Sequence, residues 1–190
     1  MSNYIPKVQV VKLGTPNTGF GLVVAAGFGA ASACDWATDY LSRNRHAYHS
    51  ARSAANFMKA VFRLYLLRQA PVQTKMMIAA KDNSGNLVAF LIDGYSATVE
   101  RVRQYYALGS GYYGAFPVQN NYYRSIMSQD ETYRVVRRSI CRGAAKDPAT
   151  GGHIMGLCIS DQVEDIFYGE RSIQWLNNHV YNFKYTHSLF

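Results

Sequence analysis

The sequence has few cysteines. Cys34, Cys141 and Cys158 are the only three among 190 residues. They are odd in number and far apart, and no CxxC pair occurs, which argues against both a zinc ribbon and a disulfide framework. We therefore expect a chain that works in a reducing compartment, the cytoplasm or the nucleus.

Long hydrophobic runs are also missing. The longest apolar stretch, at 19–31, is interrupted by glycines and is shorter than the ~20 residues that a membrane-spanning helix needs. The first residues, MSNYIPKVQ, lack the charged-then-apolar pattern of a signal peptide. The sequence therefore predicts a soluble protein with no membrane partner.

Several motifs that would identify an enzyme are absent. No strand–helix junction carries the GxGxxG or P-loop pattern of nucleotide-binding proteins. The sequence contains neither a G-x-S-x-G elbow nor a pair of carboxylates placed for glycoside hydrolysis. His46 and His49 are three residues apart, but no Cys or His pair completes a metal site with them. We expect no cofactor and no metal.

Acidic residues are in the minority. The chain has 20 Lys and Arg against 12 Asp and Glu, a net charge of +8, and by charge alone nucleic acid, an anionic membrane or an acidic subunit would suit it equally well as a partner. Arg134, Arg138 and Arg142 would form a stripe on a helix, either a solvated face or a dock for an acidic neighbour. The 15 tyrosines and 9 phenylalanines are dispersed, which favours packing and protein interfaces over base stacking.

Length and composition indicate one globular domain over residues 1–190. A helix is expected at about 31–47, which has small and aromatic residues, and another at 53–69, where apolar residues recur at helical spacing. Residues 109–123 are expected to form a glycine-led turn that enters a further helix. Helices in pairs, with antiparallel strands between and after them, indicate an α+β fold. The expected strands lie at 7–12, 21–27, 76–82, 87–93, 97–102, 104–109, 153–160 and 163–169, and the tail at 171–181 is expected to form a short helix.

Ser128 and Glu131 form a capping box, which predicts a helix that runs to about residue 146. Its buried stripe is expected to contain Tyr133, Val136, Ile140 and Ala144. The corner KDPATGGHI at 146–154 follows this helix. It is either a helix stop with a turn, or a place where a carboxylate, a hydroxyl and backbone amides converge.

A second glycine-rich segment, ALGSGYYG, occupies residues 107–114. Its Gly-Ser-Gly lets the backbone approach another group closely, and Ser110 could cap the helix that follows. Taken alone, this segment does not identify a function.

Read in order, these segments resemble the beta subunits of the 20S proteasome, of the chymotrypsin-like type. The order and spacing of the landmarks hold over residues 7–170. The resemblance implies a four-layer α-β-β-α sandwich of the N-terminal nucleophile (Ntn) hydrolase type and assembly into rings. The matching landmarks are KVQVV at 7–11, AAGFGAASACDW at 25–36, ANFMKAVFRLYL at 55–66, the hairpin at 78–93, YALGSG at 106–111 and KDPATGGHI.

The resemblance also implies roles for particular residues. Lys7 matches the lysine that lowers the proton affinity of the nucleophile. Ser110, Asp147 and Thr150 match the group that orients the N-terminal amine, although the family normally has Ser where this chain has Thr150. The oxyanion glycine matches either Gly27 or Gly29, because of an apparent insertion.

The sequence departs from the family at its start. Active members begin with a threonine well before the matching lysine, but here only six residues precede Lys7, so the nucleophile and the first two strands have no counterpart. Ser2 would lie on the same strand as Lys7, and cleavage before Thr15 would sever Lys7 from the chain. Missing strands would leave sheet edges and core surface uncovered, which predicts rearranged packing or an obligate partner.

Three hypotheses follow from these observations. The first is a catalytically inactive proteasome-beta-like protein with a structural, assembly or binding role, whose partners are proteasome-like subunits or further copies of itself. Lys7, Ser110, Asp147 and Thr150 would then be relic supporting residues or would line a small-ligand pocket. The second is an active threonine-type endopeptidase subunit. The third is a basic binding module for nucleic acid or another acidic partner.

Overall fold

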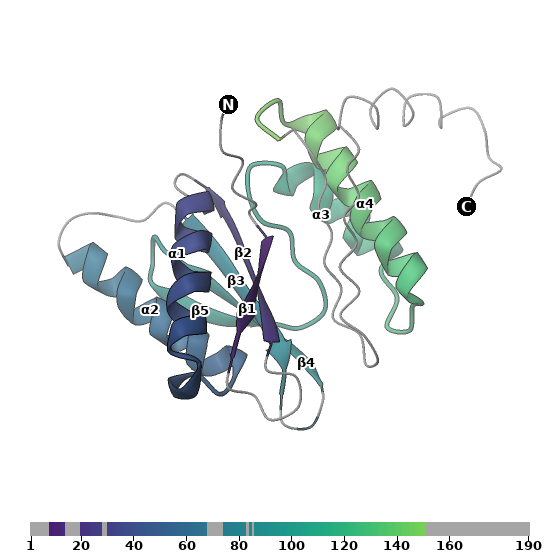
Figure 1. Cartoon of the computed structure of the whole chain (residues 1–190). Helices are drawn as coiled ribbons and strands as arrows, with labels where there is room; N and C mark the ends of the chain where they lie inside the picture. Colours follow the sequence, from purple (N-terminus) through teal and green to yellow (C-terminus); the bar gives the residue numbers. More distant parts are fainter. Residues whose placement is uncertain are drawn as a thin grey trace, which may run out of the picture. The chain divides into compact units, whose positions relative to one another are not determined.

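The computed structural model describes residues 8–13, 20–27, 30–67, 74–82, 84 and 86–150. The described residues up to Arg103 form one compact unit, and those from Gln104 to Thr150 form another (Figure 1). No helix in these described ranges is both long enough and apolar enough to cross a membrane.

The first unit is built on a five-stranded antiparallel sheet in the order β1-β2-β3-β4-β5, so each strand pairs with its neighbours in sequence. In the central pair, Met76 lies opposite Ile92 and Ile78 opposite Phe90. All four side chains therefore point to the same face. The strands are β1 (Val8–Lys12), β2 (Phe20–Gly27), β3 (Thr74–Lys81), β4 (Leu87–Asp93) and β5 (Thr98–Val102).

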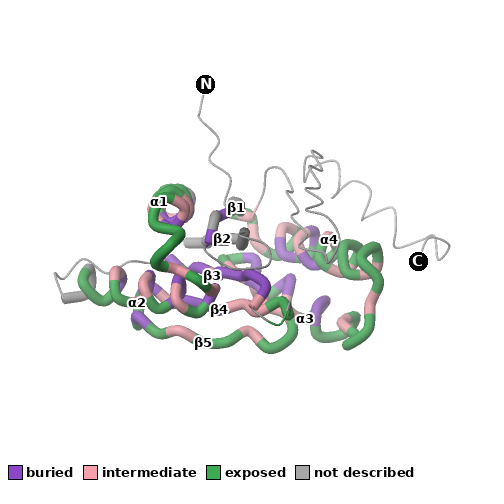
Figure 2. Tube along the Cα trace, turned by 60° about the horizontal axis from the view of Figure 1, so that its bottom comes forward, coloured by how far each residue is buried: buried purple, intermediate pink, exposed green. Residues whose placement is uncertain are grey.

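Two helices, α1 (Ala30–Arg43) and α2 (Ala51–Leu67), cover that face of the sheet. A short 3-10 helix, η1 (Arg45–Ala47), lies between them. Figure 2 shows their outer sides as exposed and the sides that meet the sheet as buried. The fully buried residues of this core include Val11, Leu41, Met58, Met76, Ile78 and Ile92.

The second unit contains two helices, α3 (Tyr112–Tyr122) and α4 (Gln129–Lys146), which pack against each other. The predicted capping box at the start of α4 is confirmed. The amide of Glu131 donates to the Ser128 side chain, and the amide of Ser128 donates to Oε2 of Glu131 at 2.9 Å. These bonds satisfy amides that the first turn of a helix otherwise leaves without partners.

Most of the predicted elements in the described ranges are confirmed, but the strand expected at 104–109 is wrong. Residues 103–110 have no regular secondary structure. The rings of Tyr105 and Tyr106 instead pack on α3, with centroids 5.7 Å from Phe116 and 6.3 Å from Tyr112 respectively. These aromatic contacts hold the segment against the helix. The strands expected at 153–160 and 163–169 and the helix expected at 171–181 lie outside the described residues.

The buried stripe expected on α4 is also wrong. Tyr133 and Val136 are exposed to 41% and 44%, and the residues that α4 buries are Ser139, Cys141 and Gly143. Gly143 lies at the crossing with α3, where the two backbones come too close together for a larger side chain. The apolar periodicity of α4 therefore did not identify the side that packs.

Candidate functional site

A close helix crossing positions the candidate site. A Cβ built on Gly114 would lie 2.4 Å from the carbonyl oxygen of Arg142 and 2.8 Å from Cα of Gly143. A Cβ on Gly143 would in turn lie 3.0 Å from the carbonyl oxygen of Gly111. The backbones of α3 and α4 therefore touch here, and the start of α3 lies beside the end of α4.

Beside this crossing, three residues that the sequence singled out come together. The Thr150 hydroxyl donates to Oδ2 of Asp147 at 2.5 Å, and the Ser110 hydroxyl donates to the same carboxylate. The amide of Ala149 donates to Oδ1 of Asp147 at 3.1 Å. We call Ser110, Asp147 and Thr150 the hydroxyl–carboxylate cluster.

The local sequence explains why Asp147 and Thr150 meet. Asp147 is the last capping residue of α4, and its amide still donates to the carbonyl of Gly143 at 2.9 Å. Pro148 cannot extend the helix, because it has no amide hydrogen. The amide of Thr150 then donates back to the carbonyl of Asp147 at 3.0 Å, which closes a tight turn. The helix stop and the convergence of polar groups are thus the same feature.

The other side of the cluster comes from the Gly-Ser-Gly segment. Gly109 has a φ of 94°, a conformation that residues with a Cβ rarely adopt. Gly111, rather than Ser110, is the capping residue of α3, and no side chain caps that helix. The prediction that Ser110 could cap α3 is therefore wrong, and its hydroxyl serves Asp147 instead.

These hydrogen bonds keep Asp147 ionised. The hydroxyl of Ser110, that of Thr150 and the amide of Ala149 all favour the charged form and hold the pKa of Asp147 below its usual value. A group with a lowered pKa stabilises the fold above its ordinary pKa, and this contribution is lost as the pH falls through the lowered value. The cluster thus offers a fixed anion flanked by two hydroxyl oxygens, which can accept further hydrogen bonds, for example from an amine.

We expect Ser110→Ala to raise the pKa of Asp147 toward its ordinary value, because the substitution removes the donor with the largest effect on that carboxylate. The measurement is a carboxyl-carbon NMR titration of the full chain. Ser125→Ala, at an exposed position outside the cluster, is the control and should leave the pKa of Asp147 unchanged. An unchanged titration in Ser110→Ala would contradict the geometry of the cluster.

Three further residues were predicted to belong to the site: Lys7, Gly27 and Gly29. Lys7 and Gly29 lie outside the described ranges. Gly27 is the last residue of β2, opposite Thr74 of β3, and belongs to the first unit. Its role and that of Gly29 as alternative oxyanion glycines therefore remain predictions, as does the role of Lys7.

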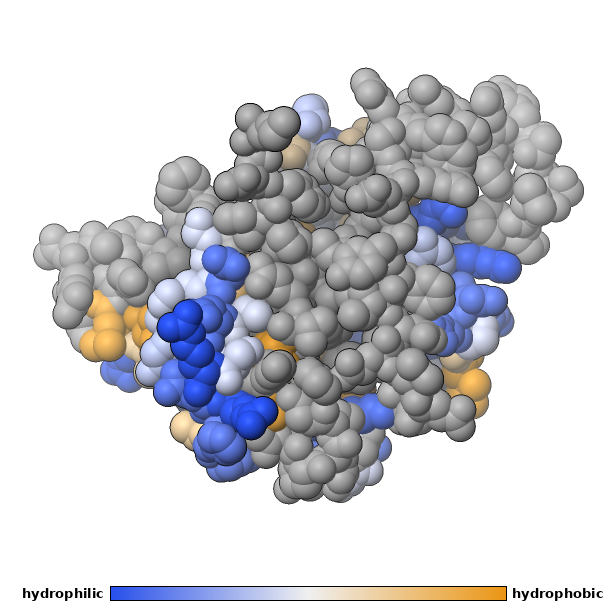
Figure 3. Space-filling view, viewed as in Figure 1, coloured by the Kyte–Doolittle hydropathy of each residue, from blue (hydrophilic) through white to orange (hydrophobic). Residues whose placement is uncertain are grey.

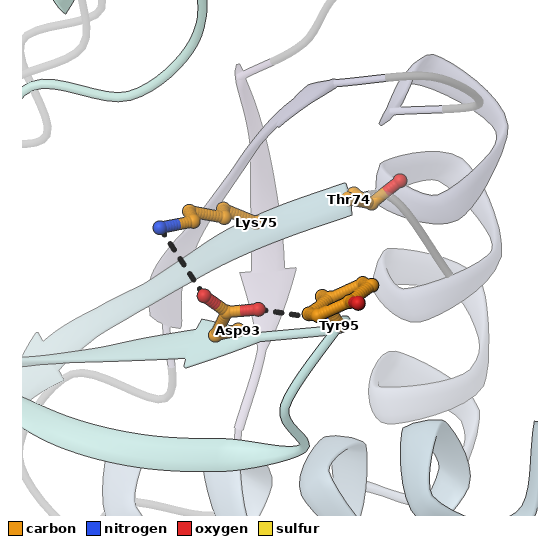
Figure 4. Close-up of a pocket in the computed structure, with 4 residues that line it drawn as sticks. All are labelled: Thr74, Lys75, Asp93 and Tyr95. Carbon is orange, nitrogen blue, oxygen red and sulfur yellow. Dashed lines mark hydrogen bonds and ion pairs between the residues drawn. The ribbon is translucent and has the colours of Figure 1, made fainter. Parts of the chain in front are cut away.

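The first unit contains a shallow hollow that the sequence did not indicate, lined by Thr74, Lys75, Asp93 and Tyr95 (Figure 4). Lys75 and Asp93 are directly opposite in the β3–β4 register, and Nζ lies 3.1 Å from Oδ2. Burial alone would raise the pKa of Asp93, but hydrogen bonds from Lys75 and from the amides of Ser96 and Tyr95 outweigh it and lower the pKa. The Asp93 carboxylate thus stabilises the pairing of β3 with β4 and the turn that follows β4, which is a structural role.

Burial works against a nucleophilic role for the two described cysteines. Burial raises the pKa of Cys34 to about 11, so its thiol stays protonated at neutral pH. Burial likewise raises the pKa of Cys141, which lies within α4. Among the described residues, no group of three His, Cys, Asp or Glu side chains is placed to hold a metal ion.

Comparison with known proteins agrees with the resemblance seen in the sequence. The family model described as "Proteasome subunit" matches residues 19–158, which is most of the chain and includes the whole hydroxyl–carboxylate cluster. None of the curated proteins matches the chain. The described elements, an antiparallel sheet with helices and a further helix pair, are compatible with the α+β fold of this family. From the matched range and this fold, the chain belongs to the proteasome subunit family.

Proposed function

We propose that the chain is a catalytically inactive proteasome-beta-like protein with a structural, assembly or binding role in the cytoplasm or nucleus. Its partners would be proteasome-like subunits or further copies of itself. Family membership supports a role in a proteasome-type assembly. The four-layer Ntn-hydrolase sandwich that the sequence predicts is part of this proposal.

The observation that carries the proposal is the place of the threonines relative to β1. Thr15, the first threonine of this sequence, follows β1. β1 pairs with β2 over its full length, and Val11 and the adjoining Leu13 are 0% and 1% exposed in the core. Releasing any threonine of this sequence as a new N-terminus would therefore cut away an integral strand.

A covalent threonine-directed inhibitor tests the proposal. We expect intact-mass analysis of the purified full chain to show no added inhibitor mass, and a fluorogenic peptide to remain uncleaved. An active proteasome treated in parallel is the positive control. Stoichiometric labelling of the chain would overturn the proposal, and the labelled residue would show where the nucleophile comes from.

The hydroxyl–carboxylate cluster favours a second candidate, an active threonine-type peptidase whose nucleophile comes from outside these residues. The hydroxyls of Ser110 and Thr150 both hydrogen-bond to Asp147. Such an arrangement could orient an N-terminal amine that acts as general base. If labelling occurs and Asp147→Ala abolishes it while the chain stays folded, this candidate replaces the first. Native mass, measured alongside intact mass, gives the assembly state and the processing in the same experiment.

A further inference from the structure

The positive charge of the chain is concentrated in one segment. Eight of the 20 lysines and arginines lie between residues 40 and 81, and no Asp or Glu occurs there. The remaining 12 basic residues are balanced by all 12 acidic ones. The whole net charge of +8 thus belongs to the segment that runs from the end of α1 through α2 and β3.

Within this segment, α2 arranges its charges in a line. Arg52, Asn56, Lys59 and Arg63 are spaced at i, i+4, i+7 and i+11, so they share one face of the helix over about 16 Å. Arg52, Asn56 and Arg63 are exposed and Lys59 is half-exposed. We call Arg52, Lys59 and Arg63 the α2 basic stripe.

The α2 basic stripe has no counter-charge among the described residues. None of its three members forms an ion pair with a described carboxylate, and Arg45 and His46 extend the exposed basic surface into the connector before α2. Figure 3 shows strongly hydrophilic side chains gathered over the exposed side of α1 and around the lower end of that helix. Arg52 and Arg63 are exposed, so their side chains can reach the carboxylates of a partner.

The charges of the α2 basic stripe are unfavourably placed on their own helix. Arg52 lies in the first turn of α2, where the positive end of the helix dipole disfavours a cation, and that turn contains no acidic residue. Lys59 and Arg63 are like charges at i, i+4, which repel each other. Exposed charges that repel one another or the helix dipole are expected at sites where a binding partner supplies the opposite charge.

The arginines of α4 differ in this respect. The first turn of α4 contains Asp130 and Glu131, which complement the helix dipole, and Arg138 lies over the ring of Tyr122 at 4.2 Å. Arg124 pairs with Glu131 at 2.6 Å. Of the two basic helix faces, the one on α2 is the better candidate for an acidic partner.

The aromatic side chains near the α2 stripe argue against nucleic acid. Tyr40 and Phe57 stack with ring centroids 4.8 Å apart and an interplanar angle of 5°, and Tyr48 and Trp36 pack against Phe57 and Tyr40. Rings that stack on one another do not provide the open platforms on which unpaired bases stack. The guanidinium groups of Arg52 and Arg63 can each form paired hydrogen bonds with a carboxylate, so an acidic protein segment is a suitable partner.

We propose that the α2 basic stripe is a docking surface for an acidic segment of a protein partner, a run of Asp and Glu that pairs with Arg52, Lys59 and Arg63. The partner's carboxylates supply the counter-charge that α2 lacks and remove both local repulsions. The α2 basic stripe can bind such a partner whether or not the chain cleaves peptides.

The test is binding of a fluorescein-labelled decaglutamate peptide to the full chain at low salt. The triple variant Arg52→Gln, Lys59→Gln, Arg63→Gln should weaken binding by about tenfold or more, since three charge pairs are lost at once. The matched control, Arg101→Gln, Arg134→Gln, Arg142→Gln, removes the same net charge from other exposed positions and should change binding by less than about twofold. Glutamine keeps the helix propensity of the residues replaced in α2 and α4, and Arg101 is an exposed position of β5, so both variants should fold.

Three outcomes would overturn the proposal. The first is equal weakening in the two triple variants, which would mean that net charge rather than this surface attracts the peptide. The second is tighter binding of a decathymidylate oligonucleotide than of decaglutamate, lost in the α2 variant, which would assign the surface to nucleic acid. The third is no measurable binding of decaglutamate at low salt. A negative inhibitor assay leaves all three readouts unaffected.

Discussion

Leu41→Ala is expected to lower the free energy of unfolding by about 3 kcal/mol. Leu41 lies in α1 and is 0% exposed, within the core that α1 and α2 form with the sheet. Truncation removes the transfer free energy of the buried side chain and leaves a cavity. Because Ala37 and Ala51, which are also fully buried in that core, are already small, little nearby volume can collapse into the cavity.

Denaturant unfolding of the full chain, followed by circular dichroism, measures this effect. Leu64→Ala is the matched control, because Leu64 is also a helical leucine but is 57% exposed in α2. It should change the free energy of unfolding by less than about 0.5 kcal/mol. Similar losses in the two variants would mean that α1 does not cover the sheet in the way described.

The part of the fold that the sequence predicted well is the part where one periodicity dominates. The hairpin of β3 and β4 was readable because two apolar runs flank a glycine-containing turn. α2 was readable because Ala54, Met58 and Phe62 recur at helical spacing, and all three are buried. In these segments, local pattern and tertiary burial give the same answer.

Prediction failed where contacts between helices override the local pattern. Tyr133 and Val136 carry the apolar periodicity of α4, but the crossing with α3 selects the side with Ser139 and Gly143. Close approach of two backbones requires small residues, and hydrophobicity does not record that requirement. Around Tyr105, a segment with the composition of a strand lies along α3 instead, held by contacts between aromatic rings.

The sequence identified the residues of the candidate site, but it did not predict that they contact one another. The resemblance to proteasome beta subunits singled out Ser110, Asp147 and Thr150, and these three do meet. Nothing in the spacing of 37 residues between Ser110 and Asp147 indicates such a contact, which depends on how α3 crosses α4. The glycines at that crossing are the signal in the sequence, since three of them line the contact.

The crossing itself can be tested with Gly114→Ala, which is expected to lower the free energy of unfolding by about 2 kcal/mol or more. The new Cβ would lie 2.4 Å from the carbonyl oxygen of Arg142. Both atoms belong to backbone or to Cβ, so no flexible side chain can move aside and the helices must separate. Elsewhere in a helix, replacing Gly with Ala stabilises by up to ~1 kcal/mol, so a loss here has the opposite sign from the helix propensity.

Separation of the helices also predicts an effect on the candidate site. Ser110 is carried on the α3 side of the crossing and Asp147 on the α4 side, so Gly114→Ala should weaken their hydrogen bond and raise the pKa of Asp147. Asn121→Ala, at an exposed position near the end of α3, controls for substitution in the same helix and should leave both readouts unchanged. Denaturant unfolding and the carboxyl titration of Asp147 measure the two effects. If Gly114→Ala stabilises the chain as an ordinary helical alanine does, α3 and α4 do not meet through their backbones, and another contact must hold the hydroxyl–carboxylate cluster.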